Sequence, residues 1–303
     1  MIPRIDAQAL AEGDPEAVAL TREGAHEIGF LTVHNTALTA AEVEAALDAY
    51  RGFFKLPAAL KEAVNMDRTK SNRGWGAPGS ERVDPKANPD YKQVFDCGYE
   101  LPAGHPLADQ GLKGYAPNQW PQGLPAFQRR ISDYYSKSLV VAKSLLGDIL
   151  SAVGEDPAFF DDAFTAPMAL LRGNFYPTRP ALAGEKDFGI ATHTDYGCLT
   201  LLATDGSPGL EVRKRGGGWI PVSAPPGEFD INLGEMIEMW TNKAVRATPH
   251  RVIGGSLERL SIPMFFNPNY DVIVAPLGSN DRMLAGDYLT KRFNETYVHL
   301  KDD

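Results

Sequence analysis

The sequence predicts a β-rich α+β fold, in which short strands form a barrel or jelly roll packed against one long helix and a set of N-terminal helices. After Asp156, short apolar segments separated by turn residues dominate the chain, which is typical of such β-architectures. Between Phe127 and Val153, apolar residues recur at helical spacing and predict the longest helix. The segments before residue 120 alternate shorter helical patterns with strand-like runs.

Local signals define the elements of the N-terminal half. Asp14 and Pro15 suit the start of a helix, because aspartate can cap the first turn and proline is tolerated there. Thr39 opens the next helix, which ends before Pro57. The predicted order is a strand at 2–5, a helix at 15–28, a strand at 29–33, a helix at 39–53, a short helix ending near 64, an irregular segment at 67–79, a strand at 92–99 and the long helix at 127–153.

The C-terminal half predicts strands joined by turns, with two helices. The expected strands are 168–176, 190–195, 199–203, 210–213, 219–222, 229–233, 250–253, 259–266 and 271–275. A brief helix is predicted at 234–240 and a closing helix at 287–300. Because no repeat or clear linker interrupts the pattern, we expect residues 1–303 to form a single domain, with a cap region at 1–120 and the jelly-roll core at 160–280.

Composition excludes several classes of function. The net charge of −9 and the pI of about 5.2 come without a basic block, which argues against a nucleic-acid or anionic-membrane partner. Cys97 and Cys198 are the only cysteines, which argues against a disulfide framework and fits a reducing cytosol. The N-terminus has no signal-peptide pattern, and no apolar run is long enough to span a membrane. We therefore expect a cytoplasmic protein and leave its oligomeric state open.

Residues 74–79 match the G-x-G-x-x-G pattern of dinucleotide-binding turns. That motif requires a buried strand before it and a helix beginning within it. The polar segment 67–72 does not have the character of a buried strand, and Pro78 and Pro85 disfavour the helix. We therefore interpret these residues as a loop and reject a Rossmann fold.

A candidate metal site lies where the strand at 190–195 runs into a turn. His193 and Asp195 are two residues apart, so they project to the same side of that strand. His250, at the start of a later strand, is the natural third ligand among six histidines. Two imidazoles and one carboxylate form the facial triad of non-haem Fe(II) oxygenases. An H-x-D triplet alone is common by chance, so the prediction needs support from elsewhere in the chain.

That support comes from polar pairs on two other predicted strands. Arg259 and Ser261 share the face of their strand opposite its alternating apolar residues. A guanidinium beside a hydroxyl is a fitted carboxylate receptor, although a surface arginine on an edge strand is the more common case. Asn174 and Tyr176 end an earlier strand on one face, and both side chains can donate hydrogen bonds.

Together these motifs resemble the isopenicillin-N-synthase-like branch of the Fe(II)/2-oxoglutarate-dependent oxygenases. The shared pattern is H-T-D, a histidine 55 residues after the aspartate, R-x-S nine residues later and an upstream N-x-Y-P. Further similar segments span most of the chain, at 2–6, 29–33, 53–57 (F-F-K-L-P) and 117–121 (P-N-Q-W-P). The order His34-Asn35 departs from the family's usual Asn-His, at a position that holds no metal in the family.

The resemblance implies a double-stranded β-helix (jelly-roll) core and an oxygenase that uses Fe(II), 2-oxoglutarate and O₂. It implies three catalytic metal ligands, which are His193, Asp195 and His250. It also implies four co-substrate residues, with Arg259, Ser261 and Tyr176 at the distal carboxylate of 2-oxoglutarate and Asn174 near its metal-chelating end. A small-molecule substrate would be hydroxylated, desaturated or cyclised, with release of succinate and CO₂.

Three alternative functions remain open at this point. They are an oxidase that uses no 2-oxo acid, as isopenicillin N synthase does, an ethylene-forming enzyme that fragments 2-oxoglutarate, and a catalytically silent binding protein.

The sequence does not identify the substrate. Three cations that an acidic substrate could contact are Arg73, Lys92 and Arg172. Three aromatic residues that could stack on an apolar substrate are Trp75, Phe95 and Phe266. Cations are more often solvated and aromatic side chains more often part of the core, so these six residues are candidates only.

Overall fold

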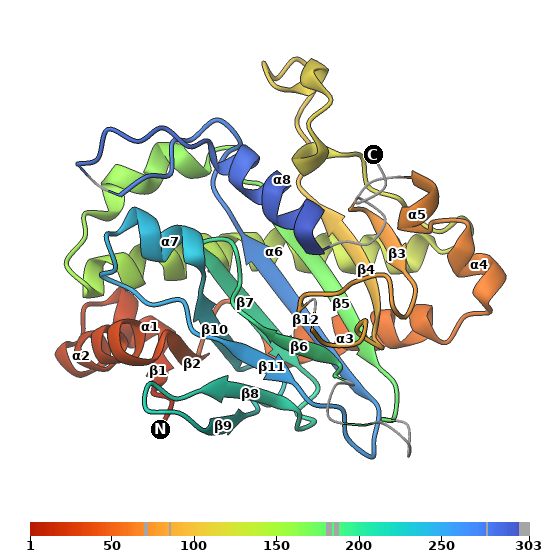
Figure 1. Ribbon diagram of the computed structural model, residues 1–303, viewed down its shortest axis with the longest axis horizontal. Helices are drawn as coiled ribbons and strands as arrows, with labels where there is room; N and C mark the ends of the chain where they lie inside the picture. Colours follow the sequence, from red (N-terminus) through yellow and green to blue (C-terminus); the bar gives the residue numbers. More distant parts are fainter. Residues whose placement is uncertain (70–71, 85, 180–183, 185–187, 277, 297–303) are drawn as a thin grey trace.

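Two β-sheets form the centre of the fold. The computed structural model describes residues 1–69, 72–84, 86–179, 184, 188–276 and 278–296. One sheet has eight strands in the order β1-β2-β10-β7-β12-β5-β4-β3, and the other has four in the order β6-β11-β8-β9. The smaller sheet lies in front of the larger one in Figure 1. Buried side chains from both sheets, among them Leu202 and Val212, form one apolar cluster, so the sheets pack face to face. The predicted β-rich α+β class with a jelly-roll core is confirmed.

The strands are short and almost entirely antiparallel. The larger sheet contains β1 (Arg4–Asp6), β2 (Phe30–His34), β3 (Gly74–Gly76), β4 (Gln93–Gly98), β5 (Leu170–Tyr176), β7 (Leu199–Thr204), β10 (Phe229–Leu233) and β12 (Arg259–Phe266). The smaller sheet contains β6 (Ile190–His193), β8 (Leu210–Arg213), β9 (Trp219–Val222) and β11 (His250–Val252). Every residue of β5, β7 and β10 is buried. These central strands are therefore covered on both faces.

Two helices, at 40–54 and 125–152, cover the face of the larger sheet that points away from the smaller one. The helical segments are α1 (Ala7–Ala11), α2 (Pro15–Glu23), η1 (Gly24–Ile28), α3 (Ala40–Phe54), α4 (Ala58–Glu62), α5 (Met66–Thr69), η2 (Ala108–Gln110), η3 (Lys113–Tyr115), α6 (Pro125–Ala152), η4 (Pro157–Phe164), α7 (Glu235–Trp240) and α8 (Ala285–Thr296). The long helix α6 crosses behind the larger sheet in Figure 1 and contacts β7 and β12. Its buried residues recur at helical spacing, as predicted.

Capping side chains fix where the N-terminal helices begin. Asp14 accepts hydrogen bonds from the backbone N–H groups of Glu16 and Ala17 at the start of α2. Thr39 and Glu42 form a reciprocal capping box at the start of α3. Both starts agree with the sequence prediction.

Besides the short helical segments α1 and η2 to η4, which were not predicted, the structure differs from the predicted elements in three places. The single helix expected at 15–28 is α2 followed by a π-helical segment, η1, which ends at Gly29 with φ of 71°. The supposed irregular loop at 67–79 contains α5 and β3, because residues 74–76 pair with β4. The strand predicted at 271–275 is absent, since Ile273 makes only an isolated bridge to Leu284. The closing helix α8 is described to Thr296, and residues 297–300 of its predicted range lie outside the described residues.

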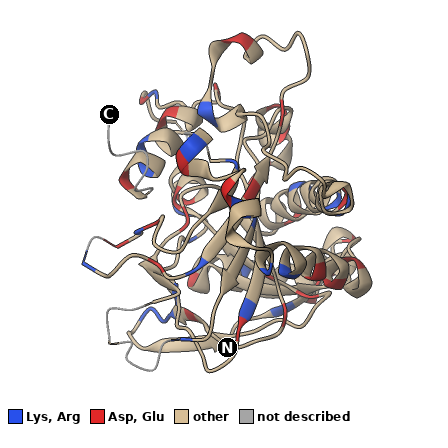
Figure 2. Ribbon diagram, turned by 90° about the vertical axis from the view of Figure 1, so that its right-hand side faces the viewer, with Lys and Arg blue, Asp and Glu red and all other residues tan. Residues whose placement is uncertain are grey.

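Charged residues of both signs are interspersed over the helices seen in Figure 2, which agrees with the absence of a basic block in the sequence. Across the described ranges, every helix is too short or too polar to cross a lipid bilayer.

A close contact between β5 and α3 leads to a testable prediction. A Cβ atom added at Gly173 would lie 2.3 to 2.8 Å from three ring carbons of Tyr50, which is fully buried. We expect Gly173→Ala to lower the free energy of unfolding by about 1–3 kcal/mol, because the core would be overpacked. Urea denaturation measures this change.

Gly52→Ala is the matched control. Gly52 lies in α3 with nothing within 4 Å of an added Cβ, so alanine there should raise stability by about 0.5–1 kcal/mol. If Gly173→Ala were as well tolerated as Gly52→Ala, the contact of β5 with α3 would be wrong.

Candidate metal centre and adjoining cavity

The two histidines of the predicted triad lie side by side on adjacent strands of the smaller sheet. His193 ends β6 and His250 begins β11, and the two are register partners of this antiparallel pair. The Nδ1 atom of His193 lies 2.8 Å from the carbonyl oxygen of Ala191, and Nδ1 of His250 lies 3.1 Å from that of Thr248. These hydrogen bonds assign the proton of each neutral ring to Nδ1. Each Nε2 is thereby left with a lone pair for a metal.

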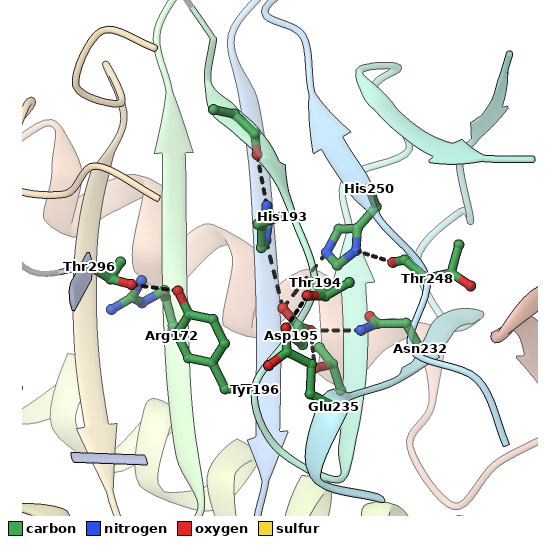
Figure 3. A network of polar contacts seen from close by, with 12 residues as sticks. Arg172, His193, Thr194, Asp195, Tyr196, Asn232, Glu235, Thr248, His250 and Thr296 are labelled. Carbon is green, nitrogen blue, oxygen red and sulfur yellow. Dashed lines mark hydrogen bonds and ion pairs between the residues drawn. The ribbon is translucent and has the colours of Figure 1, made fainter. Parts of the chain in front are cut away.

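Asp195 completes the triad from the turn that joins the two sheets. Its Oδ1 atom lies 3.7 Å from Nε2 of His193 and 3.7 Å from Nε2 of His250. In the described part of the chain, this is the one group of three metal-ligating side chains whose donor atoms all lie within 4.8 Å of one another. The structure therefore brings together the three residues that the sequence singled out (Figure 3).

Burial and mutual charge set the protonation of this group. Burial lowers the pKa of His193 to about 4, and the neighbouring His250 acts in the same direction. Burial opposes ionisation of Asp195, but the two imidazoles and hydrogen bonds from Asn232 and Thr200 outweigh it and lower the pKa of this carboxyl. At neutral pH the site thus offers a neutral imidazole at His193 and a carboxylate, which are the forms that bind metal.

The second oxygen of Asp195 is held by residues that sequence analysis missed. Its Oδ2 atom accepts a hydrogen bond of 2.7 Å from Nδ2 of Asn232 on β10 and another from the hydroxyl of Thr200 on β7. A signal for Asn232 exists in the sequence, because Asp230 and Asn232 interrupt an otherwise apolar strand with a period of two.

The predicted co-substrate residues form two cross-strand pairs. On β12 and β5, Arg259 pairs with Tyr176 and Ser261 pairs with Asn174. The guanidinium carbon of Arg259 lies 5.1 Å from the Tyr176 ring centroid, and Nδ2 of Asn174 lies 3.5 Å from the hydroxyl oxygen of Ser261. All four side chains are buried.

Two nitrogen donors of the Arg259 guanidinium are unused among the described residues. Among the described residues, its Nε and Nη1 atoms are buried without a hydrogen-bond partner, and no carboxylate forms an ion pair with it. Burial raises the pKa of Asp230 to about 6, and the charge of Arg259 offsets this only in part. Because a buried cation without a partner is costly, this arrangement fits an anionic ligand.

A cavity of about 120 Å³, open to solvent at its mouth, leads to His193 and Asp195. His193, Asp195 and Asn174 lie on its wall, as do Phe265 of β12 and Phe293 of α8. Helix α8 crosses in front of the larger sheet at this end of the molecule (Figure 1). A small organic molecule has room to reach the triad from this side.

Three of the predicted substrate contacts are cations that already have partners. Nζ of Lys92 lies 2.7 Å from Glu81 and 3.0 Å from Asp90. Arg172 binds both oxygens of Asp96, at 2.8 and 2.6 Å, and also Glu81 at 2.8 Å.

Arg73 donates to the backbone oxygens of Asn72 and Gly114. The three cations lie on the cavity wall, but Lys92 and Arg172 are already paired with carboxylates that were not foreseen from the sequence, and contact with a substrate stays a prediction.

Burial and charge compete within this network. Burial opposes ionisation of Glu81, but Arg172 and Lys92 together hold its pKa at about 2. For Asp96, burial dominates and raises the pKa in spite of Arg172.

The three predicted aromatic contacts lie in the hydrophobic core and not on the cavity wall. Trp75 donates from its indole nitrogen to Gln93, 3.1 Å away. Phe95 packs edge-to-face against Phe53, and Phe266 stacks on Phe164 with ring centroids 4.8 Å apart. All three side chains point into the core. Their position therefore gives no support to a role in substrate binding.

Thr194 and Tyr196, on either side of Asp195, connect the turn to α7 and α8. The hydroxyl of Thr194 donates to Glu235, which also accepts 2.6 Å and 3.2 Å hydrogen bonds from Tyr288 and Arg292 of α8. Tyr196 shares a hydrogen bond with Thr296 (Figure 3). Side chains alternate along this segment, so one set faces the metal site while the other holds the closing helix.

Two protein families match this chain. Residues 2–123 match the family described as non-haem dioxygenase in morphine synthesis N-terminal, and residues 167–268 match the 2OG-Fe(II) oxygenase superfamily. A 2-oxoglutarate-Fe(II) type oxidoreductase of Aspergillus fumigatus is 32% identical over 273 residues, covering 88% of this chain and 80% of that protein.

Solved structures of related proteins share the fold of this chain. A full-length Neurospora crassa protein in complex with alpha-KG and thymine has a TM-score of 0.82 at 25% identity, covering 97% of this chain and 96% of that chain. JOX2 in complex with 2OG, Fe and JA has a TM-score of 0.79 at 28% identity, covering 99% of this chain and 88% of that chain.

The buried ion pairs of Arg172 predict a large loss of stability when this side chain is replaced. Arg172→Met would leave Asp96 buried without its bidentate partner, and it would remove one of the cations beside Glu81. We expect the free energy of unfolding to fall by about 3–5 kcal/mol, measured by urea denaturation.

Arg4→Met is the control, because Arg4 and Glu228 form an exposed ion pair worth about 1 kcal/mol or less. If both substitutions lowered the free energy of unfolding by the same amount, the buried ion pairs of Arg172 would stabilise the fold no more than the exposed pair does.

Proposed function

Because this chain belongs to the Fe(II)- and 2-oxoglutarate-dependent oxygenases, we propose that His193, Asp195 and His250 hold its Fe(II) and that Arg259 anchors its 2-oxoglutarate. The enzyme is a 2-oxoglutarate-dependent dioxygenase that acts on a small molecule. The observation that carries the residue assignment is a buried guanidinium whose Nε and Nη1 atoms have no hydrogen-bond partner among the described residues, on the strand paired with that of Asn174, which lines the cavity with His193 and Asp195.

The donor set supports the assignment of the metal ligands. Two imidazole nitrogens and one carboxylate oxygen are the combination that leaves coordination positions open on Fe(II). Each histidine donates its other ring N–H to a backbone carbonyl, as metal-bound histidines generally do. The ligands thus need little reorientation on binding, because their rings are already fixed by the protein.

The distal carboxylate of 2-oxoglutarate fits the surroundings of Arg259. A planar guanidinium offers parallel N–H donors to two carboxylate oxygens, and the hydroxyl groups of Ser261 and Tyr176 lie on the same pair of strands. Asn174 lies beside Ser261 and on the wall of the cavity that holds His193, which suits a position between the distal carboxylate and the metal.

Bound Fe(II), 2-oxoglutarate and O₂ together supply the oxidising chemistry, in which 2-oxoglutarate leaves as succinate and CO₂. The residues of this chain bind and orient the metal, the co-substrate and the substrate, and they exclude water from the site. Asp195 and His193 border the cavity, so one side of the site is open towards it, while Phe265 and Phe293 supply apolar wall. An oxidase that uses no 2-oxo acid is not favoured, because the relatives described above use 2-oxoglutarate.

For the substrate, we propose an uncharged small molecule in preference to an acid. Lys92 and Arg172 on the cavity wall are already matched by Glu81, Asp90 and Asp96, and Arg73 donates to two backbone oxygens, so an added carboxylate would have to compete with these partners. A succinate-release screen that pairs uncharged compounds with their carboxylic-acid analogues tests this, and higher turnover of the acids would contradict it.

Variants of the proposed ligands separate metal binding from co-substrate binding. His193→Ala and His250→Ala should abolish succinate release, because two donors hold a metal weakly. Arg259→Met should leave metal binding intact but raise the KM for 2-oxoglutarate by about 10- to 100-fold, since a hydrogen-bonded charge pair is worth about 1.5–3 kcal/mol. Succinate formation over a range of 2-oxoglutarate concentrations measures both effects.

The control is Arg213→Met, because Arg213 is exposed on β8 of the smaller sheet. Its KM for 2-oxoglutarate should equal that of the unmodified protein. An unchanged KM in Arg259→Met would refute the anchoring role, and full turnover in His193→Ala would refute the ligand set.

A further inference from the structure

We propose that Thr200 and Asn232 are positioning residues that restrict Asp195 to binding the metal through one oxygen. This inference rests on the proposed function, because it takes Asp195 as a metal ligand. It assigns a role to two side chains that lie outside the triad and outside the 2-oxoglutarate site.

The two oxygens of Asp195 have different surroundings. Oδ1 lies 3.7 Å from the Nε2 atom of each triad histidine, so it faces the space that the metal would fill. Oδ2 accepts hydrogen bonds from Asn232, at 2.7 Å, and from the hydroxyl of Thr200. One oxygen is therefore free for a metal while the other is occupied by two protein donors (Figure 3).

The donors are fixed by the larger sheet. Thr200 on β7 and Asn232 on β10 are register partners, so they lie side by side on adjacent antiparallel strands. Both are almost fully buried, with 4% and 3% of their surface exposed. Neither side chain can turn away without leaving a polar group unsatisfied in the interior.

The backbone of Asp195 is held by the same part of the fold. The N–H of Glu235 donates to the Asp195 carbonyl oxygen at 2.8 Å, just after β10 ends. A Cβ added at Gly234 would lie 2.8 Å from that carbonyl oxygen and 2.4 Å from that of Gly197, so glycine permits this close approach. Main chain and side chain of Asp195 are thus both anchored to β10 and the residues that follow it.

This anchoring has a chemical consequence for the open coordination face. Carboxylates bind metals through one oxygen or through both. Rotation of Asp195 to present both oxygens would break the hydrogen bonds from Asn232 and Thr200, which are strong because the acceptor is ionised. With Oδ2 retained by the protein, Asp195 occupies one position, and the positions needed by co-substrate and O₂ stay open.

A purely structural explanation makes a different prediction. If Thr200 and Asn232 only satisfy a buried carboxylate, removing them lowers thermal stability and leaves the metal's affinity and coordination unchanged. If they position Asp195, metal affinity and coordination change as well. Metal binding and unfolding must therefore be measured on the same variants.

The experiment uses the full chain without 2-oxoglutarate or substrate, with Mn(II) and Co(II) as separate probes. Electron paramagnetic resonance of free Mn(II) gives the affinity, and the visible d–d absorption of Co(II) reports the coordination number. Thr200→Val, which is nearly isosteric, and Asn232→Leu should each weaken Mn(II) binding by about 10- to 100-fold. The Co(II) absorption should weaken as the second Asp195 oxygen adds to the coordination shell.

Two further variants serve as controls. Thr200→Ser keeps the hydroxyl and should restore Mn(II) affinity to within about twofold of the unmodified protein. Thr241→Val removes a buried hydroxyl that bonds the Ile237 carbonyl oxygen in α7, so it should alter thermal unfolding only. If Asn232→Leu fails to fold, Thr200→Val decides the question alone.

The outcomes distinguish this inference from the proposed function. Unchanged Mn(II) affinity and Co(II) absorption in Thr200→Val, together with loss of binding in His193→Ala, would overturn the positioning role and leave the ligand set intact. Binding that survives in His193→Ala would overturn both.

Discussion

Strand register is the constraint on which the site depends. His193 and His250 are register partners in the smaller sheet, while Thr200 with Asn232, and Arg259 with Tyr176, are register partners in the larger one. A slip of one residue would turn any of these side chains to the opposite face. The surrounding apolar residues forbid such a slip, because it would expose them. Packing of the core therefore sets the geometry of the polar site.

The segment 193–196, where β6 runs into the turn before β7, combines metal binding with attachment of the closing helix. Its odd-numbered side chains, His193 and Asp195, face the metal site, and its even-numbered ones, Thr194 and Tyr196, contact Glu235 and the closing helix. The residues next to the metal ligands in the sequence thus hold α8, which forms part of the cavity wall. On the cavity wall, Lys92 and Arg172 are paired with Glu81 and other buried carboxylates, so these charges offset one another.

The sequence predicted those features that depend on local pattern. Alternation placed Arg259 and Ser261 on one face of β12, and the capping residue Thr39 located the start of α3 correctly. Features that depend on tertiary pairing were missed. Glu81 and Asp96 come from separate segments and meet Arg172 only in the folded chain, and Phe95 proved to face the core, since periodicity does not say which side of a strand is covered. Ile273 shows a further limit, because a β-prone run becomes a strand only where a partner strand is available.

Anomalous X-ray diffraction at the iron edge, on crystals grown anaerobically with Fe(II) and 2-oxoglutarate, tests the central assignment most directly. The account predicts one iron peak at bonding distance from Nε2 of His193, Nε2 of His250 and a single oxygen of Asp195, with the distal carboxylate of 2-oxoglutarate against Arg259. An iron peak away from these three atoms, or a 2-oxoglutarate carboxylate that makes no contact with Arg259, would contradict it.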